Sequence, residues 1–202
     1  MKLTIHEFLT LDGVMQGPGG AEEDTSGGFE RGGWLVPHVD QDFGVIVSGW
    51  FAPAEAILLG RTTFMLMRGY WPQVTDPDNL VAAALNGLPK YLVSSTVTEP
   101  DWGDTTVLPG DPVEGVRALK EREGGELQVH GSWQLASALH AAGLIDEYRL
   151  LRFPVTVGAG KRLFTDDAPA RGFELLESRT TGAGVVYTML APTEFAAGHV
   201  EG

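Results

Sequence analysis

The sequence predicts an α/β fold in which a mostly parallel central sheet ends in an antiparallel hairpin. Short apolar runs typical of buried strands alternate with segments of helical periodicity, which favours parallel strands joined by helices. Near the C-terminus, two strand-like segments within 173–192 are joined through Gly-Ala-Gly at 182–184, a turn sequence typical of a hairpin. No linker divides the chain, so we expect a single domain over residues 1–192 and a loose tail over 193–202.

The first half of the chain supplies two predicted strands and two predicted helices. Residues 2–10 alternate in polarity and predict the first strand, and the apolar run 54–60 predicts a strand that is buried on both faces. A polar, Gly-rich loop follows the first strand over 11–28, and loops of this length are commonly either functional or disordered. Residues 61–70 are predicted to begin as a helix. Another helix is indicated by apolar residues at helical spacing: Val39, Phe43, Ile46, Val47 and Trp50.

The second half of the chain continues the alternation of strands and helices. Its predicted elements are a strand over 89–96, a helix over 112–123, a strand over 127–130, a helix over 132–143, a strand over 146–155 and the two strands of the hairpin. The carboxyl ends of parallel strands meet at one edge of a sheet, and ligands bind in the crevice outside that edge. We therefore expect a binding site among the residues that directly follow the strands.

Composition and charge exclude several classes of partner. The formal net charge of −13 repels nucleic acid and anionic membrane surfaces, so we expect neither as a partner. The chain has no long apolar run, and its first residues lack the apolar core of a signal peptide. It contains no cysteine, which excludes disulfides and thiolate metal sites and suits a reducing cytoplasm. We expect a cytoplasmic protein.

Small and polar residues follow three of the predicted strands. They are Gly60-Arg61-Thr62-Thr63, Ser94-Ser95-Thr96 and His130-Gly131-Ser132. Hydroxyls and backbone amides suit the oxygens of phosphate and ribose, and each helix that begins there adds roughly +0.5 charge from its dipole. The guanidinium of Arg61 would supply a fork for a phosphate. Each segment alone is equally explained by Ser and Thr as helix caps, but the three together indicate a nucleotide crevice.

Motifs for other kinds of site are incomplete. The Gly-rich segment 157–164 lacks the first glycine of a phosphate loop because Val155 stands there, and Arg162 replaces the Ser or Thr that would bind magnesium. The Gly-x-Ser-x-Gly elbow of hydrolases does not occur. The acidic segment 38–42 is explained by the favourable charge of carboxylates in the first turn of a helix. We therefore predict no metal site.

Five segments, in this order, resemble the dihydrofolate reductase-like family. They are LDGVM after the first strand, ILLGRTTF, YLVSST, VHGSWQL and IDEYRLLRFPVTVGAGKRLF. The last segment is very similar to the branch that includes the reductase domain of the riboflavin-biosynthesis deaminase–reductase. The resemblance spans roughly residues 2–192 and implies a three-layer dihydrofolate reductase-like fold that binds NADPH without a separate cofactor domain.

The resemblance also implies which residues bind the cofactor. Those that would hold its phosphates are Gly60, Arg61, Thr62 and Thr63, with Arg61 near the 2′-phosphate. Those by the adenosine would be Ser94 and Ser95, and those around the pyrophosphate would be Gly131, Ser132, Gln134 and Leu135. The loop from Leu11 to Gln16 would close over the nicotinamide. The last turn differs from the family pattern of two or three glycines, because this chain has Gly131-Ser132-Trp133.

The substrate side of the site is expected to hold a catalytic acid, aromatic side chains and an anion anchor. The family's dihydrofolate reductases use an acidic residue early in the helix before the 54–60 strand, and Asp42 has the nearest spacing; the alternative is a solvated helix carboxylate. Trp34 and Trp71 would stack on a heterocycle or else cover the core. Lys161 and Arg162 would anchor the phosphate of a phosphoribosylamino pyrimidine or else be surface charges.

The predicted function is NADPH-dependent reduction of a small heterocyclic substrate. It would be similar to the 5-amino-6-(5-phosphoribosylamino)uracil reductase step of riboflavin biosynthesis, with hydride passing directly to a bound carbon. The deaminase half of the bifunctional enzyme is excluded because its zinc motif needs cysteines. The alternative is a non-catalytic protein that keeps the fold and binds a nucleotide or small molecule. The family branch also suggests a homodimer, formed through the C-terminal hairpin region.

Overall fold

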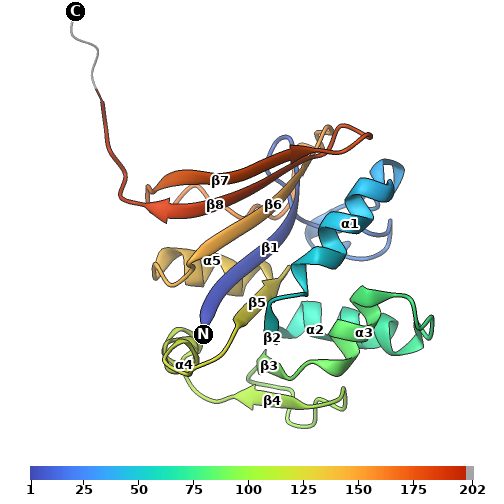
Figure 1. The fold of residues 1–202 in the computed structure, drawn as a ribbon, viewed down its shortest axis with the longest axis vertical. Coiled ribbons are helices and arrows are strands. Elements are labelled where there is room, and N and C mark those ends of the chain that lie inside the picture. The colour runs from blue at the N-terminus through green and yellow to red at the C-terminus, as the bar shows by residue number, and fades with distance from the viewer. Residues whose placement is uncertain (199–202) are drawn as a thin grey trace, which may run out of the picture.

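An eight-stranded sheet runs through the centre of the molecule, with its strands in the order β4-β3-β2-β5-β1-β6-β8-β7 (Figure 1). The computed structural model describes residues 1–198, and the end of the predicted tail, 199–202, lies outside them. The strands are β1 (Lys2–Thr10), β2 (Ala54–Gly60), β3 (Lys90–Val93), β4 (Thr105–Leu108), β5 (Glu126–His130), β6 (Glu147–Phe153), β7 (Gly172–Thr180) and β8 (Val186–Thr193). The α-helices are α1 (Gln41–Trp50), α2 (Arg61–Tyr70), α3 (Leu80–Gly87), α4 (Pro112–Lys120) and α5 (Trp133–Ala141).

Strand pairing separates a parallel part of the sheet from an antiparallel edge. β1 lies between β5 and β6 and is parallel to both, so that His6 pairs with His130 on one side and with Arg149 on the other. β2, β3 and β4 continue the parallel part beyond β5. β8 is antiparallel to β6 and to β7, with Tyr187 opposite Leu151. The predicted mostly parallel sheet with a C-terminal antiparallel hairpin is therefore confirmed.

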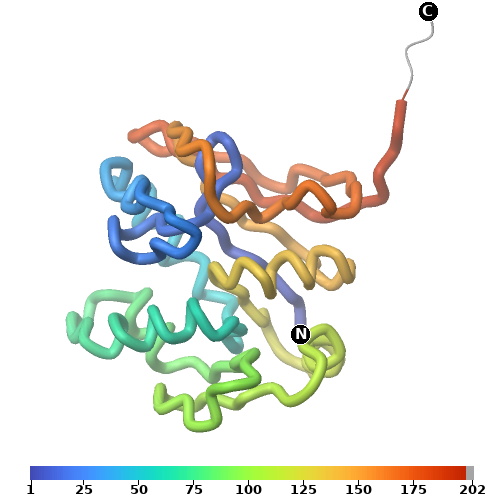
Figure 2. Tube along the Cα trace, turned by 180° about the vertical axis from the view of Figure 1, so that it is seen from behind, coloured from blue at the N-terminus to red at the C-terminus, as the bar shows by residue number. Residues whose placement is uncertain are grey.

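Helices cover both faces of the sheet and give the fold its three layers. α4 and α5 pack against one face through residues such as Val116 and Leu139. α1, α2 and α3 pack against the opposite face, where Trp50, Phe64 and Leu85 are buried. The burial of β2 on both sides explains why it reads in the sequence as a continuous apolar run. Figure 2 shows the N-terminus beside α4, where the amino group of Met1 donates to the carbonyl of Lys120 at 2.6 Å.

Two elements are not predicted from the sequence. The helix α3 begins after Asn79, whose side chain accepts a hydrogen bond from the Ala82 amide at 2.9 Å and so caps it. The strand β4 has four residues and pairs with β3 alone, at the edge of the sheet. Such a short edge strand leaves too few residues for a periodic pattern. β3 is also shorter than predicted, because it ends at Val93, before the polar segment that begins at Ser94.

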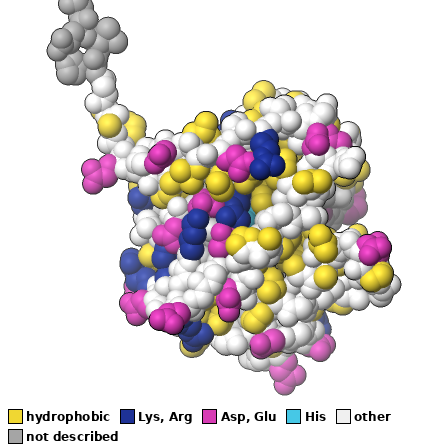
Figure 3. Space-filling view, viewed as in Figure 1, with side chains coloured by type: hydrophobic (Ala, Val, Ile, Leu, Met, Phe, Trp, Pro, Cys, Tyr) yellow, Lys and Arg dark blue, Asp and Glu magenta, His cyan; other side chains and the backbone are white. Residues whose placement is uncertain are grey.

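The C-terminal hairpin forms the other edge of the sheet and is the most exposed part of it. Leu175 and Leu176 of β7 are exposed, and Figure 3 shows apolar side chains beside charged ones on the face that this view presents. The homodimer stays a prediction. Within residues 1–198, no helix combines the length and the apolar character needed to cross a membrane.

Candidate functional site

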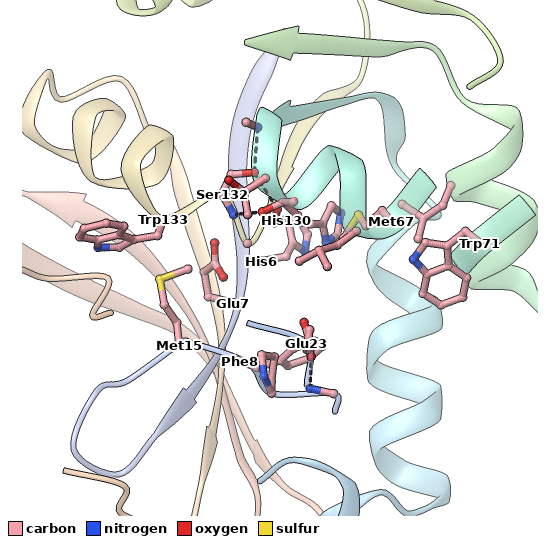
Figure 4. A pocket seen from close by; sticks show the side chains of 18 of the residues that line it. His6, Glu7, Phe8, Met15, Glu23, Met67, Trp71, His130, Ser132 and Trp133 are labelled. Atoms are coloured by element: carbon pink, nitrogen blue, oxygen red, sulfur yellow. Dashed lines mark hydrogen bonds between the residues drawn. The ribbon is translucent and has the colours of Figure 1, made fainter. Parts of the chain in front are cut away.

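The predicted crevice exists as one large cleft at the carboxyl ends of β1, β2, β3 and β5. Its volume is about 2260 Å³, compared with roughly 300–1,000 Å³ for a typical ligand pocket. Parts of α1, α2 and α3 and of the loop over residues 15–24 complete its walls. Figure 4 shows side chains from these elements converging on the same space. The cleft is large enough to hold two ligands side by side.

All ten residues predicted to bind a cofactor line this cleft. They are Gly60, Arg61, Thr62, Thr63, Ser94, Ser95, Gly131, Ser132, Gln134 and Leu135. They come from three separate turns, which the sheet brings together because β2, β3 and β5 are parallel. Their cofactor role itself stays a prediction.

Ser132 connects two of these turns. Its Oγ accepts a hydrogen bond from the Gly60 amide at 2.9 Å, and its own amide donates to Thr63 Oγ1 at 2.8 Å. To make these contacts Ser132 adopts φ 60° and ψ 48°, a left-handed conformation that few residues other than glycine adopt. Gly131 before it is also left-handed, with φ 56°, and a Cβ there would lie 3.3 Å from the Thr63 side chain. The turn is thus a rigid corner in which a side chain at 131 would be crowded.

Two of the helices that begin at the cleft, α2 and α5, have no side-chain cap. Gly60 before α2 has no side chain, and the Ser132 side chain before α5 accepts no hydrogen bond from the first turn of its helix. The other α-helices of the described chain are each capped by a side chain, from Asp40, Asn79 and Asp111. The first amides of a helix need an acceptor and carry the positive end of its dipole. Uncapped helix starts at the wall of a cleft therefore suit the oxygens of a phosphate group.

Two further polar groups extend this wall. The Arg61 side chain is exposed in the first turn of α2, and no carboxylate of residues 1–198 lies within ion-pair distance of it. Ser94 Oγ accepts hydrogen bonds from the amides of Thr96 and Val97, at 3.2 and 3.0 Å, which fixes the turn after β3. The donor set of this half of the cleft, with amides, hydroxyls and one guanidinium, fits a phosphorylated nucleotide.

An aromatic layer forms the floor of the other half. The His6 and His130 rings stack with centroids 4.8 Å apart, and His130 stacks on Phe51 at 5.0 Å. Trp50 meets His6 edge-on at 4.9 Å. Burial, reinforced by the positive charge of Arg149, lowers the pKa of both histidines, to about 3 for His130. The floor is therefore aromatic and uncharged at neutral pH.

Glu7 is the buried acid of the cleft. Its side chain comes from β1, is only 3% exposed and lines the cleft (Figure 4). Its Oε1 has no hydrogen-bond partner among the described residues. Burial raises the pKa of Glu7 well above the usual value, and a hydrogen bond from the Gly131 backbone opposes that effect only in part.

The loop after β1 contributes acidic residues to the cleft, Glu23 and Asp24 among them, and Asp24 pairs with Lys161. Glu23 Oε2 accepts hydrogen bonds from the amides of Gly19 and Gly20, the latter at 3.1 Å. Lys161 lines the cleft, but its Nζ lies 2.6 Å from Asp24 Oδ2 and 2.7 Å from Ser26 Oγ. Its ammonium is therefore already neutralised by the loop.

Three predicted site residues do not line the cleft, and their roles stay predictions. Asp42 lies in the first turn of α1, and its Oδ2 accepts a hydrogen bond from the Gly182 amide of the β7–β8 turn at 3.1 Å. Trp34 is buried, and its Nε1 donates to the Gln16 carbonyl at 2.8 Å. Arg162 donates to the backbone carbonyls of Asp12 and Gly158, at 3.0 and 2.6 Å. None of the three lines the cleft, whereas Trp71 and Lys161 do.

Sequence reasoning missed Glu7 and the His6–His130 pair. The sequence does contain a signal for these residues. A carboxylate or an imidazole in an otherwise apolar strand is rarely buried unless it has a partner or a function. The strand β1 contains both His6 and Glu7, and every residue of β5 is buried, including His130.

A comparison with protein-family models decides the family. The model of the RibD C-terminal domain matches residues 1–187. The chain belongs to the RibD C-terminal domain family. A curated relative is the uncharacterized protein YyaP of Bacillus subtilis (strain 168), 29% identical over 180 residues that make up 88% of each chain.

Solved structures place the RibD C-terminal fold of this chain among dihydrofolate reductase-like proteins. Dihydrofolate reductase of Enterococcus faecalis, solved with NADP(H), matches with a TM-score of 0.59 and 12% identity over 96% of this chain and 97% of that one. A deaminase/5-amino-6-(5-phosphoribosylamino)uracil reductase of Thermotoga maritima matches with a TM-score of 0.62 and 15% identity, over 95% of this chain and 56% of the bifunctional one. At these identities the likeness concerns the fold. Residues 1–198 hold no cluster of three or more His, Asp or Glu side chains suited to a metal ion.

Proposed function

We propose that this protein is an NADPH-dependent reductase of a small, flat heterocyclic compound that carries no phosphate group. One observation carries the proposal: two uncapped helix starts and Arg61, which has no ion-pair partner within residues 1–198, share a cleft with an uncharged aromatic floor. The first half suits the phosphates of a dinucleotide, and the second suits a nicotinamide next to a planar substrate. Membership of the RibD C-terminal domain family supports reductase chemistry.

The choice of cofactor rests on the hydrogen-bond donors in the half of the cleft that contains Arg61 and the starts of α2 and α5. The amides at the starts of α2 and α5 would bind the pyrophosphate, and Arg61 would bind the 2′-phosphate that distinguishes NADPH from NADH. When bound, the cofactor would supply a hydride, and the protein would supply position and a dry surface. The Ser132 corner keeps the two helix starts at a fixed separation.

The substrate class follows from the charges around the aromatic half. Besides Glu7, the acidic residues that line the cleft are Glu22, Glu23, Asp24, Asp76 and Asp78, against the cationic groups of Arg61 and Lys161. Lys161 is bound by Asp24, and Arg162 lies outside the cleft. The phosphate of a phosphoribosylamino pyrimidine would have to displace Asp24 from Lys161. A substrate without a phosphate, such as a neutral or cationic heterocycle with a C=N or C=O bond, fits these charges better.

The test is a pair of titrations followed by a turnover screen. The protein is titrated with NADPH and NADH while the fluorescence of the reduced nicotinamide and the Tm are recorded, because a ligand that binds the native state raises Tm. We expect saturable binding, tighter for NADPH. No response up to millimolar NADPH would contradict the proposal.

Turnover separates a reductase from a binding protein. Loss of NADPH absorbance is followed with pyrimidine, pterin and quinone-like compounds, each tried with and without a phosphate where both exist. We expect the unphosphorylated forms to be reduced faster. Binding of NADPH without turnover of any compound would favour a non-catalytic sensor that keeps the fold.

A further inference from the structure

We propose that Glu7 is the catalytic proton donor of this reductase, and that its carboxylic acid protonates the substrate atom next to the carbon that receives the hydride. The proposal rests on the function proposed above, because it needs a hydride donor in the same cleft. It is carried by the position of a buried carboxyl group that lines the cleft and has one oxygen without a hydrogen-bond partner among the described residues.

The geometry of Glu7 sets it apart from a structural carboxylate. Buried polar atoms almost always have a hydrogen-bond partner, so an exception calls for an explanation. In Figure 4 the Glu7 side chain points into the cleft beside Met15, with Trp133 beyond it. The Gly131 backbone binds the carboxyl from one side, and Oε1 has no partner within residues 1–198. A substrate nitrogen or oxygen in the cleft would supply the missing acceptor.

The surroundings of Glu7 favour the protonated form of its carboxyl group. Burial raises the pKa of Glu7 well above the usual value. Lys161, a cation of the nearby loop, is bound by Asp24 and Ser26. The other titratable or charged side chains that line the cleft are His6, Glu22, Glu23, Arg61, Tyr70, Asp76, Asp78 and His130.

The alternative donors in the cleft are less suited. Burial lowers the pKa of His6 and His130, so neither ring carries an extra proton at neutral pH. Glu23 is only half-buried, and one of its oxygens already binds two backbone amides. Burial raises the pKa of Glu23 as well, but the amide hydrogen bonds stabilise its ionised form, so Glu23 holds its proton less tightly than Glu7.

In the proposed step, the carbon of a substrate C=N or C=O bond receives a hydride, with its electron pair, from the reduced nicotinamide. The π electron pair of that bond moves to the nitrogen or oxygen, which forms a bond to the Glu7 proton as the carboxyl O–H bond breaks. The substrate is reduced by two electrons and the nicotinamide is oxidised by two. The Glu7 carboxylate then regains a proton from solvent.

The decisive variant is Glu7→Gln, which keeps the shape of the side chain and removes the proton. With the compound that the turnover screen identifies, we expect kcat to fall by about 10²- to 10⁴-fold, the usual contribution of general acid catalysis. NADPH affinity should stay within about twofold of wild type. The matched control, Glu174→Gln on the exposed strand β7, should leave both values unchanged. A Glu7→Gln kcat within threefold of wild type would overturn the proposal.

The pH dependence gives two further readouts, one that does not need the variant and one that does not need the cofactor. In the wild type, kcat should fall about tenfold per pH unit above the raised pKa of Glu7, whereas a kcat that rises with pH from the acid range would overturn the proposal.

The second readout is protein stability without cofactor. Because Glu7 binds its proton more tightly in the folded than in the unfolded state, the free energy of unfolding of the wild type should fall relative to that of Glu7→Gln as pH rises from 5 to 9. Parallel stability curves would show that Glu7 is ionised and so overturn the proposal. If NADPH fails to bind, the proposed function fails, and these curves still report the state of Glu7.

Discussion

Ser132 Oγ accepts a hydrogen bond from the Gly60 amide at 2.9 Å, which ties the turn after β5 to the turn after β2. The serine holds this contact in a left-handed conformation, which costs a residue with a Cβ about 1–2 kcal/mol. A glycine would avoid that cost but has no oxygen with which to hold Gly60. The two uncapped helix starts are thus held at a set separation by a strained residue, in the part of the cleft where a pyrophosphate would bind.

Two substitutions at Ser132 separate the contribution of its hydrogen bond to Gly60 from the cost of its left-handed backbone. Ser132→Ala loses the bond to Gly60 and keeps the strained backbone, so we expect the free energy of unfolding to fall by about 1–2 kcal/mol. Ser132→Gly loses the same bond but relieves about 1–2 kcal/mol of left-handed strain. Glycine loses more conformational entropy on folding, at a cost of about 0.5–1 kcal/mol, so the loss for Ser132→Gly should be smaller than for Ser132→Ala by about 0.5–1 kcal/mol. Urea unfolding of the three proteins measures both values. A glycine variant less stable than the alanine variant would show that φ at this position carries no strain.

Arg61 should determine the preference between the two nicotinamide cofactors. A guanidinium binds a phosphate through two charge-assisted hydrogen bonds, which an amide side chain cannot reproduce. We expect Arg61→Gln to weaken NADPH binding by about tenfold or more while NADH binding changes less than twofold. The control is Arg117→Gln on α4, where the arginine is exposed, pairs with Glu114 and does not line the cleft. Equal loss of both cofactors in Arg61→Gln would assign Arg61 to the pyrophosphate instead.

The sequence predicts those parts of the site that lie at the carboxyl ends of the parallel strands, because the order of strands and helices alone brings them together. β1, β2 and β5 are buried on both faces and read as apolar or alternating runs, so their ends are found from local pattern. Once those strands are parallel, the residues that follow them must share one edge of the sheet. For this reason the turns at 60–63, 94–95 and 131–135 all line the cleft.

The residues that the sequence predicts for the site but that do not line the cleft depend on contacts between distant segments. Asp42 is held by the Gly182 amide, and Arg162 by the Asp12 carbonyl, across 140 and 150 residues respectively. Such contacts leave no periodic pattern in the chain. For Glu7 the sequence predicts the position but not the role. Its burial follows from its place in the strand β1, whereas the oxygen that lacks a partner among the described residues becomes evident only in the structure of the cleft.

The ion pair between Asp24 and Lys161 should keep anions out of the substrate half. Burial acts to raise the pKa of Asp24, but hydrogen bonds from Lys161 and Ser26 outweigh it and lower the pKa overall, so the pair persists at neutral pH. We expect Asp24→Asn to leave the Lys161 ammonium unneutralised and to tighten binding of inorganic phosphate by about tenfold, measured by calorimetry. The matched control is Asp78→Asn, a cleft carboxylate without an ion pair among the described residues. Equal phosphate affinity in Asp24→Asn and wild type would show that Lys161 does not face the substrate.

The buried histidine floor should make the protein sensitive to acid. In the folded state burial lowers the pKa of His130 from 6.5 to about 3. Because the unfolded chain then binds the proton first, the stability that neutral His130 contributes is fully present above pH 6.5 and is lost as pH falls toward 3. Between pH 7.5 and 5 this one residue should account for about 2 kcal/mol of lost stability.

His130→Phe is the variant that tests this floor, because phenylalanine can still stack on His6 and Phe51 but cannot bind a proton. Urea unfolding at pH 7.5 and at pH 5 should show a smaller drop for the variant than for the wild type, by on the order of 1–2 kcal/mol. His6 titrates in the same direction and remains in both proteins, so the difference reports on His130 and on the charge that His130 presents to His6. An equal drop in the two proteins would mean that His130 reaches solvent and accepts a proton in the folded state.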